Sequence, residues 1–218
     1  MGLGILFDLE GTLIESGYQK HPNILEKLHL DTKKMLLYIG IPKHIINKHN
    51  KSVYLRNEAY DWALTNFNDK ELIDFKNYVE NFMLEYDMLS ANNSSEYPDT
   101  KNILKYLKKK NYKIGIVTNT SKKAANYILT KFNLTKYFDI VITRQDVQKL
   151  KPDPEMLIKA SKKMKSNVQW IVGDSYVDIE AARSAKIKSI LIKRDKSIIK
   201  HHANYLINSL QEIKNILK

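Results

Sequence analysis

Short apolar segments alternate with amphipathic segments from Pro98 to the end of the chain, and this alternation constrains the fold most strongly. The apolar runs are nearly continuous, which predicts strands buried on both faces. The expected strands are 113–117, 138–142, 170–172 and 189–192, with a weaker one at 205–207. The expected helices are one that ends near 110, then 125–132, 157–164, 179–185 and 209–217. This order is typical of a parallel sheet covered by helices, so the fold class is α/β with a doubly wound parallel sheet.

The first part of the chain has a different pattern of apolar residues. Residues 3–8 are apolar up to Asp8 and are expected to join the sheet, whereas 22–89 have an almost continuously helical pattern. In its clearest stretch, apolar residues recur at steps of three and four: Leu72, Phe75, Val79, Phe82, Met83 and Tyr86. Asp69 is a candidate N-cap for that helix, and Asp31 and Pro42 indicate breaks between earlier helices. We therefore expect a core domain of residues 1–15 and 98–218, with an α-helical bundle of residues 16–97 inserted into it.

Composition excludes several classes of protein. A chain of 218 residues with 43% hydrophobic content fits one domain with an insertion, or two small domains. No stretch approaches the ~20 apolar residues that a membrane span needs, and the acidic start, with Asp8 and Glu10, does not resemble a secretory signal. Cysteine is absent, which excludes disulfides and cysteine metal sites. We expect a cytoplasmic protein without a membrane partner.

The formal net charge of +12 lies outside the middle segment. Residues 17–96 contain ten Lys/Arg and eleven Asp/Glu, and the remaining residues contain 26 and 13. Such a surface can steer anionic substrates or bind nucleic acid weakly. Many of the lysines, however, fall on the expected exposed faces of helices, where a solvated role is the commoner one.

Two carboxylates stand where the first strand ends. Asp8 and Glu10 are separated by Leu9, so the alternation of a strand can turn both toward one pocket. Paired carboxylates in this position suit a divalent metal and acid–base chemistry. The competing interpretation is a turn that is rich in Asp and Gly.

Three further strand ends carry reactive side chains. Thr118-Asn119-Thr120-Ser121 follows one strand, Lys151 follows the next after a short loop, and Gly173-Asp174-Ser175 with Asp178 follows a third. Each has an ordinary explanation, namely a helix cap, a surface lysine, a turn residue or an acid in the first turn of a helix. Sites in open parallel sheets form beyond these strand ends. Together the residues supply a nucleophile, an acid–base group, hydroxyl and amide donors, a cation and metal ligands, which is what phosphoryl transfer needs.

In order and spacing, these four motifs resemble those of the haloacid dehalogenase-like (HAD) hydrolases. Asp8-Leu9-Glu10-Gly11-Thr12 is similar to the family's Asp-x-Asp-x-Thr pattern, with Glu10 in place of the second Asp. The resemblance covers essentially the whole chain. A helical insertion after the first motif is similar to the subgroup with an α-helical cap, which includes phosphoglycolate phosphatase-like enzymes.

The resemblance implies a mechanism and a role for each residue. Asp8 would attack the substrate phosphorus and form an aspartyl-phosphate, and Glu10 would act as general acid and then as general base. Thr118, the amide of Asn119 and Lys151 would bind the phosphoryl oxygens. Mg²⁺ would be held by Asp8, the backbone carbonyl of Glu10 and Asp174, while Asp178 would support the metal indirectly. The substrate would be a small phosphorylated metabolite, such as a phosphoglycolate-like compound or a sugar phosphate.

Glu10 is the main departure from the family pattern. Its side chain has one more methylene than Asp, so its carboxyl reaches ~1.5 Å further or must fold back. The enolase-phosphatase branch is similar in having Glu at this position, so Glu is compatible with phosphatase chemistry. The haloacid dehalogenases themselves lack an acid here and need no Mg²⁺, which disfavours dehalogenase chemistry.

Two alternatives to a phosphatase remain open. A phosphomutase or other phosphotransferase of the same fold would share the chemistry of Asp8. A protein from another class would use the basic core to bind nucleic acid or an acidic protein, and would be weakly active or inactive. That function requires lysines interleaved with aromatic platforms, which the sequence does not show, so no specific nucleic-acid partner is expected. The sequence leaves open whether the chain is a monomer or a homodimer.

Overall fold

A computed structural model of the chain describes residues 2–194 and 202–217 and divides into two compact units. The α/β unit comprises Met1–Ser16 and Ser94–Lys218, and the helical unit comprises Gly17–Asn93. The sequence-based division at 16–97 therefore differs at its edges, because residues 16 and 94–97 group with the α/β unit. Whether the helical unit acts as a cap stays a prediction.

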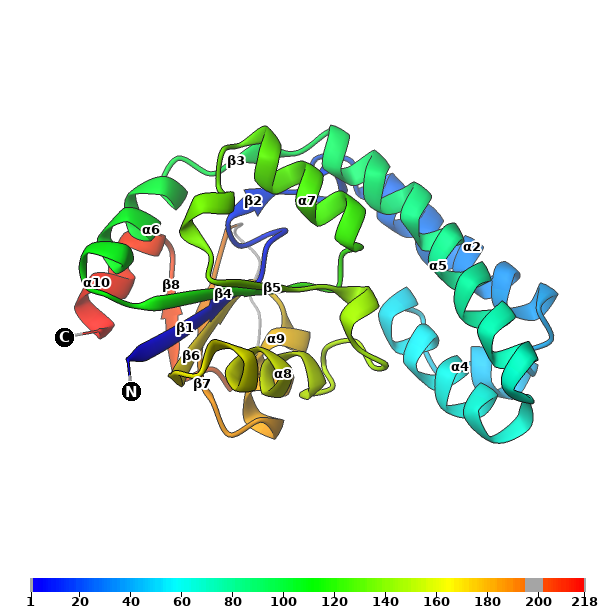
Figure 1. The fold of residues 1–218 in the computed structure, drawn as a ribbon. Helices are drawn as coiled ribbons and strands as arrows, with labels where there is room; N and C mark the ends of the chain where they lie inside the picture. Colours follow the sequence, from blue (N-terminus) through cyan, green and yellow to red (C-terminus); the bar gives the residue numbers. More distant parts are fainter. Residues whose placement is uncertain (1, 195–201, 218) are drawn as a thin grey trace. The chain divides into compact units, whose positions relative to one another are not determined.

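The α/β unit is built on a six-stranded parallel sheet with the order β5-β4-β1-β6-β7-β8. The strands are β1 (Leu3–Phe7), β4 (Lys113–Val117), β5 (Ile140–Ile142), β6 (Asn167–Gly173), β7 (Lys188–Ile192) and β8 (Tyr205–Ile207). Helices α6 (Thr100–Lys109) and α7 (Lys122–Lys131) lie on one face, and α8 (Glu155–Met164) and α9 (Tyr176–Ser184) lie on the other (Figure 1). From β1 the chain adds β4 and β5 on one side of the sheet, and it then crosses over to add β6, β7 and β8 on the other side of β1. The predicted doubly wound parallel sheet is confirmed.

Burial explains why these segments form strands. In β4 the first residue, Lys113, is exposed and the next four are buried, as expected for a strand covered on both faces. The strand expected at 138–142 begins only at Ile140. Its predecessor Asp139 instead accepts a hydrogen bond from the backbone N–H of Ile114 (2.8 Å) and pairs with two lysines. The helix expected at 209–217 is split into a 3₁₀ turn, η3 (Leu210–Glu212), and the short helix α10 (Ile213–Ile216).

A short antiparallel ribbon explains the observed boundary between the units. It pairs β2 (Ile14–Glu15) with β3 (Ser95–Glu96), the segments on either side of the inserted helices. The hydroxyl of Ser95 donates to the Glu15 carboxylate at 2.8 Å. The hydroxyl of Thr100 donates to the carbonyl of Leu13 at 2.7 Å. These bonds attach residues 94–97 to the α/β unit.

The helical unit contains α1 (Gly17–Lys20), α2 (Pro22–Tyr38), α3 (Lys43–Ile46), α4 (Ser52–Asn66) and α5 (Asp69–Asn92). Its core includes Leu36, Leu55, Tyr60, Phe75 and Met83. Four residues of the predicted α5 stripe are buried, and Leu72 and Phe82 pack against this core.

Two local predictions in the helical unit are wrong and one is confirmed. Asp31 does not break a helix but lies within α2, where it accepts from Lys27 (2.9 Å) and from the Tyr86 hydroxyl (2.7 Å). The N-cap of α5 is Asn68 rather than Asp69. Pro42 does stand at a break, immediately before α3.

None of the helices in the described part of the chain combines the length and the apolar character that crossing a membrane requires.

Candidate active site

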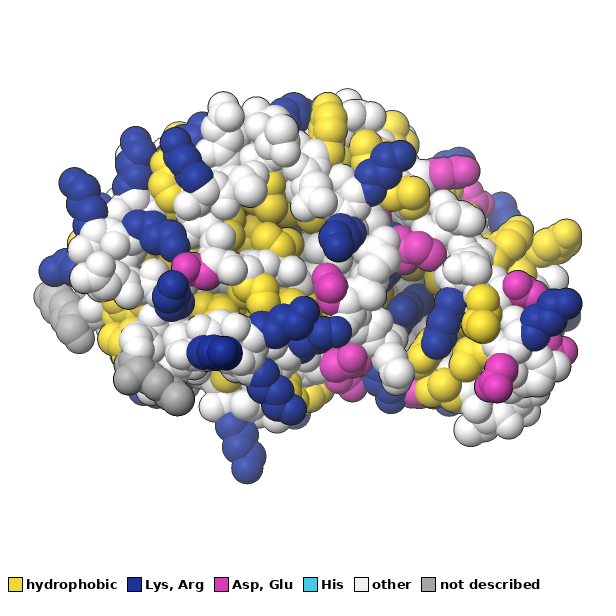
Figure 2. All heavy atoms as spheres, viewed as in Figure 1, with side chains coloured by type: hydrophobic (Ala, Val, Ile, Leu, Met, Phe, Trp, Pro, Cys, Tyr) yellow, Lys and Arg dark blue, Asp and Glu magenta, His cyan; other side chains and the backbone are white. Residues whose placement is uncertain are grey.

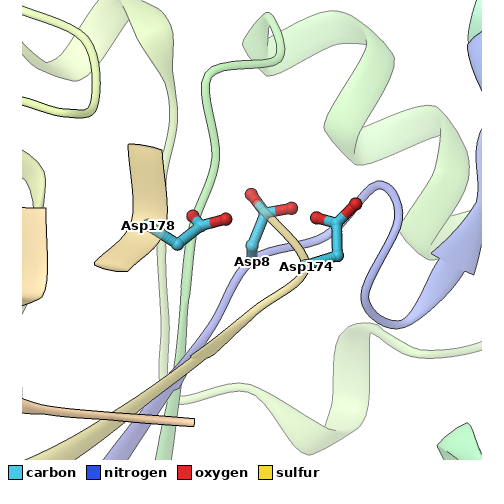
Figure 3. A group of neighbouring side chains, drawn as sticks. All are labelled: Asp8, Asp174 and Asp178. Carbon is cyan, nitrogen blue, oxygen red and sulfur yellow. The ribbon is translucent and has the colours of Figure 1, made fainter. Parts of the chain in front are cut away.

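Three aspartates meet at the carboxyl ends of two neighbouring central strands. Asp8 follows β1, Asp174 follows β6, and Asp178 lies in the first turn of α9. One carboxylate oxygen from each residue lies within 4.8 Å of the others. Figure 3 shows the three carboxylates turned toward one space beyond the ends of the strands. Parallel strands bring their carboxyl ends to one edge of the sheet, so the fold places these acids together.

Lys151 is the cation of this cluster. Its ammonium group donates to Asp8 at 2.7 Å, to Asp178 at 2.6 Å and to the backbone carbonyl of Val117 at 2.8 Å. The residue is 1% exposed, so the interpretation of Lys151 as a surface lysine is wrong. Three acceptors satisfy its three donors, as burial of an ammonium group requires.

Two glycines make the close approach of the acids possible. A Cβ on Gly11 would lie 2.1 Å from the Asp174 carboxylate, and Gly11 also has a φ of +87°. A Cβ on Gly173 would lie 2.4 Å from Asp178. The glycine after Glu10 and the glycine before Asp174 are therefore required by the geometry of the carboxylates.

The electrostatics of the site are dominated by burial and by excess negative charge. Burial raises the pKa of the Asp8 carboxyl to about 6, although Lys151 opposes this shift. Burial, followed by repulsion from Asp8 and Asp178, raises the pKa of Asp174 well above its ordinary value. Burial lowers the pKa of Lys151, but Asp178 and Asp8 outweigh it and raise that pKa above its ordinary value. One ammonium group thus opposes three carboxylates.

The donor set fits a divalent cation. All three ligating groups are carboxylates, and oxygen ligands are those that Mg²⁺ prefers. Asp178 is already engaged, because one oxygen accepts from Lys151 and the other accepts from the Ser175 hydroxyl at 2.5 Å. The Asp174 carboxylate receives a long contact of 3.5 Å from the Thr12 hydroxyl. Asp8 and Asp174 are therefore the residues best placed to hold the ion, with Asp178 beside them.

The loop after β4 is ordered by its own side chains. Thr118 is buried, and its hydroxyl accepts from the backbone N–H of Thr120 at 3.3 Å. The Asn119 side chain accepts from the Lys151 backbone N–H (3.0 Å) and donates to the Lys151 carbonyl (3.2 Å). Ser121 is the N-cap of α7, as its ordinary interpretation suggested. The same loop therefore starts a helix and fixes the backbone beside Lys151.

Sequence reasoning missed the contacts that two residues make at the site. The Thr120 hydroxyl donates to the Glu10 carboxylate at 2.5 Å. Arg144 is 2% exposed, and its guanidinium donates to the carbonyl of Asn119 at 3.2 Å. The signal for Arg144 was a basic residue two positions after the end of β5. The signal for Thr120 was its place in the Thr-Asn-Thr-Ser run.

The structure thus brings together every residue that the sequence singled out. Asp8, Lys151 and Asp178 are in direct contact, and Asp174 completes the acidic cluster. Asn119 contacts the backbone of Lys151, and Glu10 is linked through Thr120 to the loop that contains Thr118. The chemical roles assigned to these residues stay predictions.

Comparisons with known proteins show which family the chain resembles along most of its length. The sequence model of the family described as "Haloacid dehalogenase-like hydrolase" matches residues 5–192. A pyrophosphatase PpaX of Bacillus mycoides is 26% identical over 98% of this chain and 95% of its own length. The solved HAD phosphatase from Thermococcus onnurineus is 28% identical, with a TM-score of 0.62 over 100% of this chain and 98% of that one. A solved "predicted phosphoglycolate phosphatase" from Haemophilus somnus is 26% identical, with a TM-score of 0.62 over 99% and 97%.

Proposed function

Because the chain belongs to the haloacid dehalogenase-like hydrolases, we propose that it is a Mg²⁺-dependent phosphatase that acts through an aspartyl-phosphate on Asp8. The observation that supports this most directly is the buried Asp8 carboxylate at the end of β1, held by Lys151 at 2.7 Å beside Asp174 and Asp178. Phosphoryl transfer through a covalent intermediate requires a fixed nucleophile next to a cation and metal ligands.

The reaction proceeds in two displacements. An Asp8 oxygen forms a bond to phosphorus while the bond from phosphorus to the leaving oxygen breaks, and Glu10 gives its proton to that oxygen. Glu10 then takes a proton from water, which attacks the same phosphorus, releases inorganic phosphate and restores Asp8. Each step needs Glu10 in the protonation state that the previous step leaves behind.

The other residues bind and orient the phosphoryl group. Lys151 neutralises negative charge next to Asp8, and the loop of Thr118 and Asn119 supplies hydroxyl and amide donors to the phosphoryl oxygens. Asp8, Asp174 and the backbone carbonyl of Glu10 would hold Mg²⁺, which would supply positive charge to offset repulsion between nucleophile and phosphate. Burial, followed by repulsion from Asp8 and Asp178, raises the pKa of Asp174, so a cation bound here would offset negative charge.

For the substrate we propose a small organic phosphate monoester, of the phosphoglycolate or sugar phosphate type. A relative of 26% identity with a solved structure is described as a predicted phosphoglycolate phosphatase, which supports this class. The curated relative described as a pyrophosphatase favours inorganic pyrophosphate as a second candidate. Both substrates would present a phosphoryl group to the same residues.

The first experiment tests the reaction itself. Purified protein is assayed with p-nitrophenyl phosphate in Mg²⁺ and in EDTA. The test variant is Asp8→Asn, and the matched control is Asp74→Asn, which changes an exposed residue of α5. We expect loss of activity in EDTA and in Asp8→Asn, and an unchanged rate in Asp74→Asn. Activity that survives EDTA or the Asp8 substitution would contradict the proposal.

A second experiment separates the substrate classes. Phosphoglycolate, a panel of sugar phosphates and inorganic pyrophosphate are compared by kcat/KM at one Mg²⁺ concentration. We expect the highest value for an organic monoester, whereas a preference for pyrophosphate would favour the second candidate. Product analysis with sugar phosphates distinguishes release of free phosphate from its transfer within the sugar, which a phosphomutase would catalyse.

A further inference from the structure

The Glu10 carboxylate is held by a residue from a neighbouring loop. The hydroxyl of Thr120 donates to Oε2 of Glu10 at 2.5 Å, at the short end of the usual range for a charge-assisted hydrogen bond from a hydroxyl to a carboxylate. The two residues follow β1 and β4, which are adjacent strands of the sheet. Glu10 is half-buried and Thr120 is buried, so solvent competes little for this contact.

The length of Glu10 matches this partner. A side chain shorter by one methylene would withdraw the carboxylate by up to about 1.5 Å. Added to 2.5 Å, such a gap exceeds hydrogen-bonding distance. An aspartate at position 10 would therefore lose Thr120 unless the loop moved.

Thr120 is itself fixed in place. Its backbone N–H donates to the Thr118 hydroxyl at 3.3 Å, and its carbonyl accepts from the backbone N–H of Arg144 at 3.2 Å. Branching at Cβ also restricts the χ1 angle of threonine. The hydroxyl that meets Glu10 thus has few alternative positions.

We propose that Thr120 is the positioning residue of Glu10: it holds the longer carboxylate where an acid–base group is needed, and the site is built for glutamate. This inference rests on the proposed phosphatase activity and assigns Thr120 a task within it. Misplacement of a reacting group by about 1 Å can cost about 10²-fold in rate. Loss of the fixed partner should therefore lower the rate by a measurable factor.

The test uses two substrates that differ in their need for an acid. The p-nitrophenolate group leaves readily without a proton, whereas an alkoxide leaves poorly, so general acid catalysis matters more for an alkyl phosphate. We expect Thr120→Val to lower kcat/KM, which reports the first displacement, about 10- to 100-fold on an alkyl phosphate and much less on p-nitrophenyl phosphate. Thr120→Ser, which keeps the hydroxyl, should restore most of the loss.

A double-mutant cycle asks whether Thr120 acts through Glu10. Glu10→Asp should be slower than the wild type on the alkyl phosphate. In that background Thr120→Val should cost less than about 2-fold, because the contact is already absent. Thr130→Val, on the exposed side of α7, is the matched control, and melting temperatures verify folding. If the valine variant does not fold, Thr120→Ala removes the hydroxyl without placing a methyl group against Glu10.

Several outcomes would overturn the proposal. Equal losses of kcat/KM on the two substrates, or full additivity with Glu10→Asp, would show that Thr120 has a purely structural role. A Glu10→Asp variant faster than the wild type would show that the site is not built for glutamate. If the wild type turned over neither substrate with Mg²⁺, the proposed function and this inference would fail together.

Discussion

Asp174 is the acid of the site with the least compensation. It lies beside Asp8 and Asp178, whereas the Lys151 ammonium contacts those two residues and leaves Asp174 with a 3.5 Å contact from Thr12. Burial and this repulsion raise its pKa well above the ordinary value. The ionised form of Asp174 is therefore locally unfavourable, and either protonation or a bound cation would relieve it.

We predict that Asp174→Asn stabilises the metal-free protein and abolishes Mg²⁺-dependent activity. A raised pKa in the folded state means that stability falls as pH rises above the unfolded pKa of about 4. The gain should therefore be larger at pH 8 than at pH 5. Each kcal/mol corresponds to about 2–4 °C in melting temperature, which thermal unfolding in EDTA measures.

The same variant should lose most of the stabilisation that Mg²⁺ gives to the wild type. Asp74→Asn makes the same chemical change on an exposed helix face, and we expect no shift from it at either pH. A melting temperature of Asp174→Asn in EDTA below that of the wild type would contradict this account.

The residues of the site could be predicted from sequence where strand order alone decides their place. Asp8 and Asp174 directly follow neighbouring strands of one parallel sheet, so the fold collects them whatever the details of the loops. The contact between Thr120 and Glu10 could not be predicted, because it depends on the path of two loops. The burial of Arg144 also depends on such a path, and a basic residue after a strand has no sequence pattern that indicates it.

Helix α5 shows how the choice of a cap depends on neighbours in the sequence. Asn68 and Asp69 are both good N-caps by residue type. The structure uses Asn68, whose side chain accepts from the Glu71 N–H at 3.0 Å while Glu71 accepts from the Asn68 N–H at 2.9 Å. Only Asn68 has a glutamate three residues later, and this capping box decides the boundary.

We predict that Asn68→Ala destabilises the helical unit by about 1 kcal/mol, and that Asp69→Ala costs less. Trp62 lies against the core of this unit and Trp170 lies in β6, and they are the two tryptophans of the chain. A Trp170→Phe background therefore lets Trp62 fluorescence report urea unfolding of the helical unit. Equal costs for both alanine variants would contradict the assignment of the cap.

The misplaced break at Asp31 has a related cause. An aspartate within a run of helical residues is a reasonable break signal by propensity. Within α2, however, it pairs with Lys27 one turn earlier and accepts from Tyr86 of α5. Tertiary partners outweigh local propensity here, and sequence alone does not reveal them.

At the scale of the whole molecule, charge is divided between the two units. Residues 17–93 contain ten basic and ten acidic residues, so the net charge of +12 belongs to the α/β unit. Figure 2 shows Lys and Arg side chains predominating over the elements of that unit on the visible face. The α/β unit, which contains the proposed phosphoryl chemistry, is thus the unit whose positive electrostatic potential attracts anionic substrates.

Arg194 connects distant parts of the α/β unit. Its guanidinium makes two 3.0 Å hydrogen bonds to the Asp99 carboxylate and donates to the carbonyl of Thr12 at 2.6 Å. It also lies 3.9 Å from the centre of the Tyr97 ring. Asp99 in turn accepts from the backbone N–H of Leu210 at 2.8 Å. One ion pair therefore joins the loop after β1, the start of α6 and the C-terminal 3₁₀ turn.

We predict that Arg194→Ala destabilises the α/β unit by about 3 kcal/mol, since it leaves a largely buried carboxylate without its cation. Arg194→Lys should recover little of this, because an ammonium group cannot make two parallel hydrogen bonds to Asp99 and also reach Thr12. Trp170 fluorescence in a Trp62→Phe background measures the unfolding of this unit. The exposed Arg183→Ala is the control and should have little effect.

The pH dependence distinguishes the ion pair from simple packing. Burial raises the pKa of Asp99, but hydrogen bonds from Arg194 and Leu210 outweigh burial and hold that pKa below its ordinary value. A carboxyl with a depressed folded pKa contributes stability above the unfolded pKa of about 4 and loses it as pH falls through the folded pKa. The cost of Arg194→Ala should therefore be full at pH 7 and should shrink below pH 4. A cost that stayed constant across that range would show that Arg194 acts through its contacts with Tyr97 and Thr12 rather than through its ion pair with Asp99.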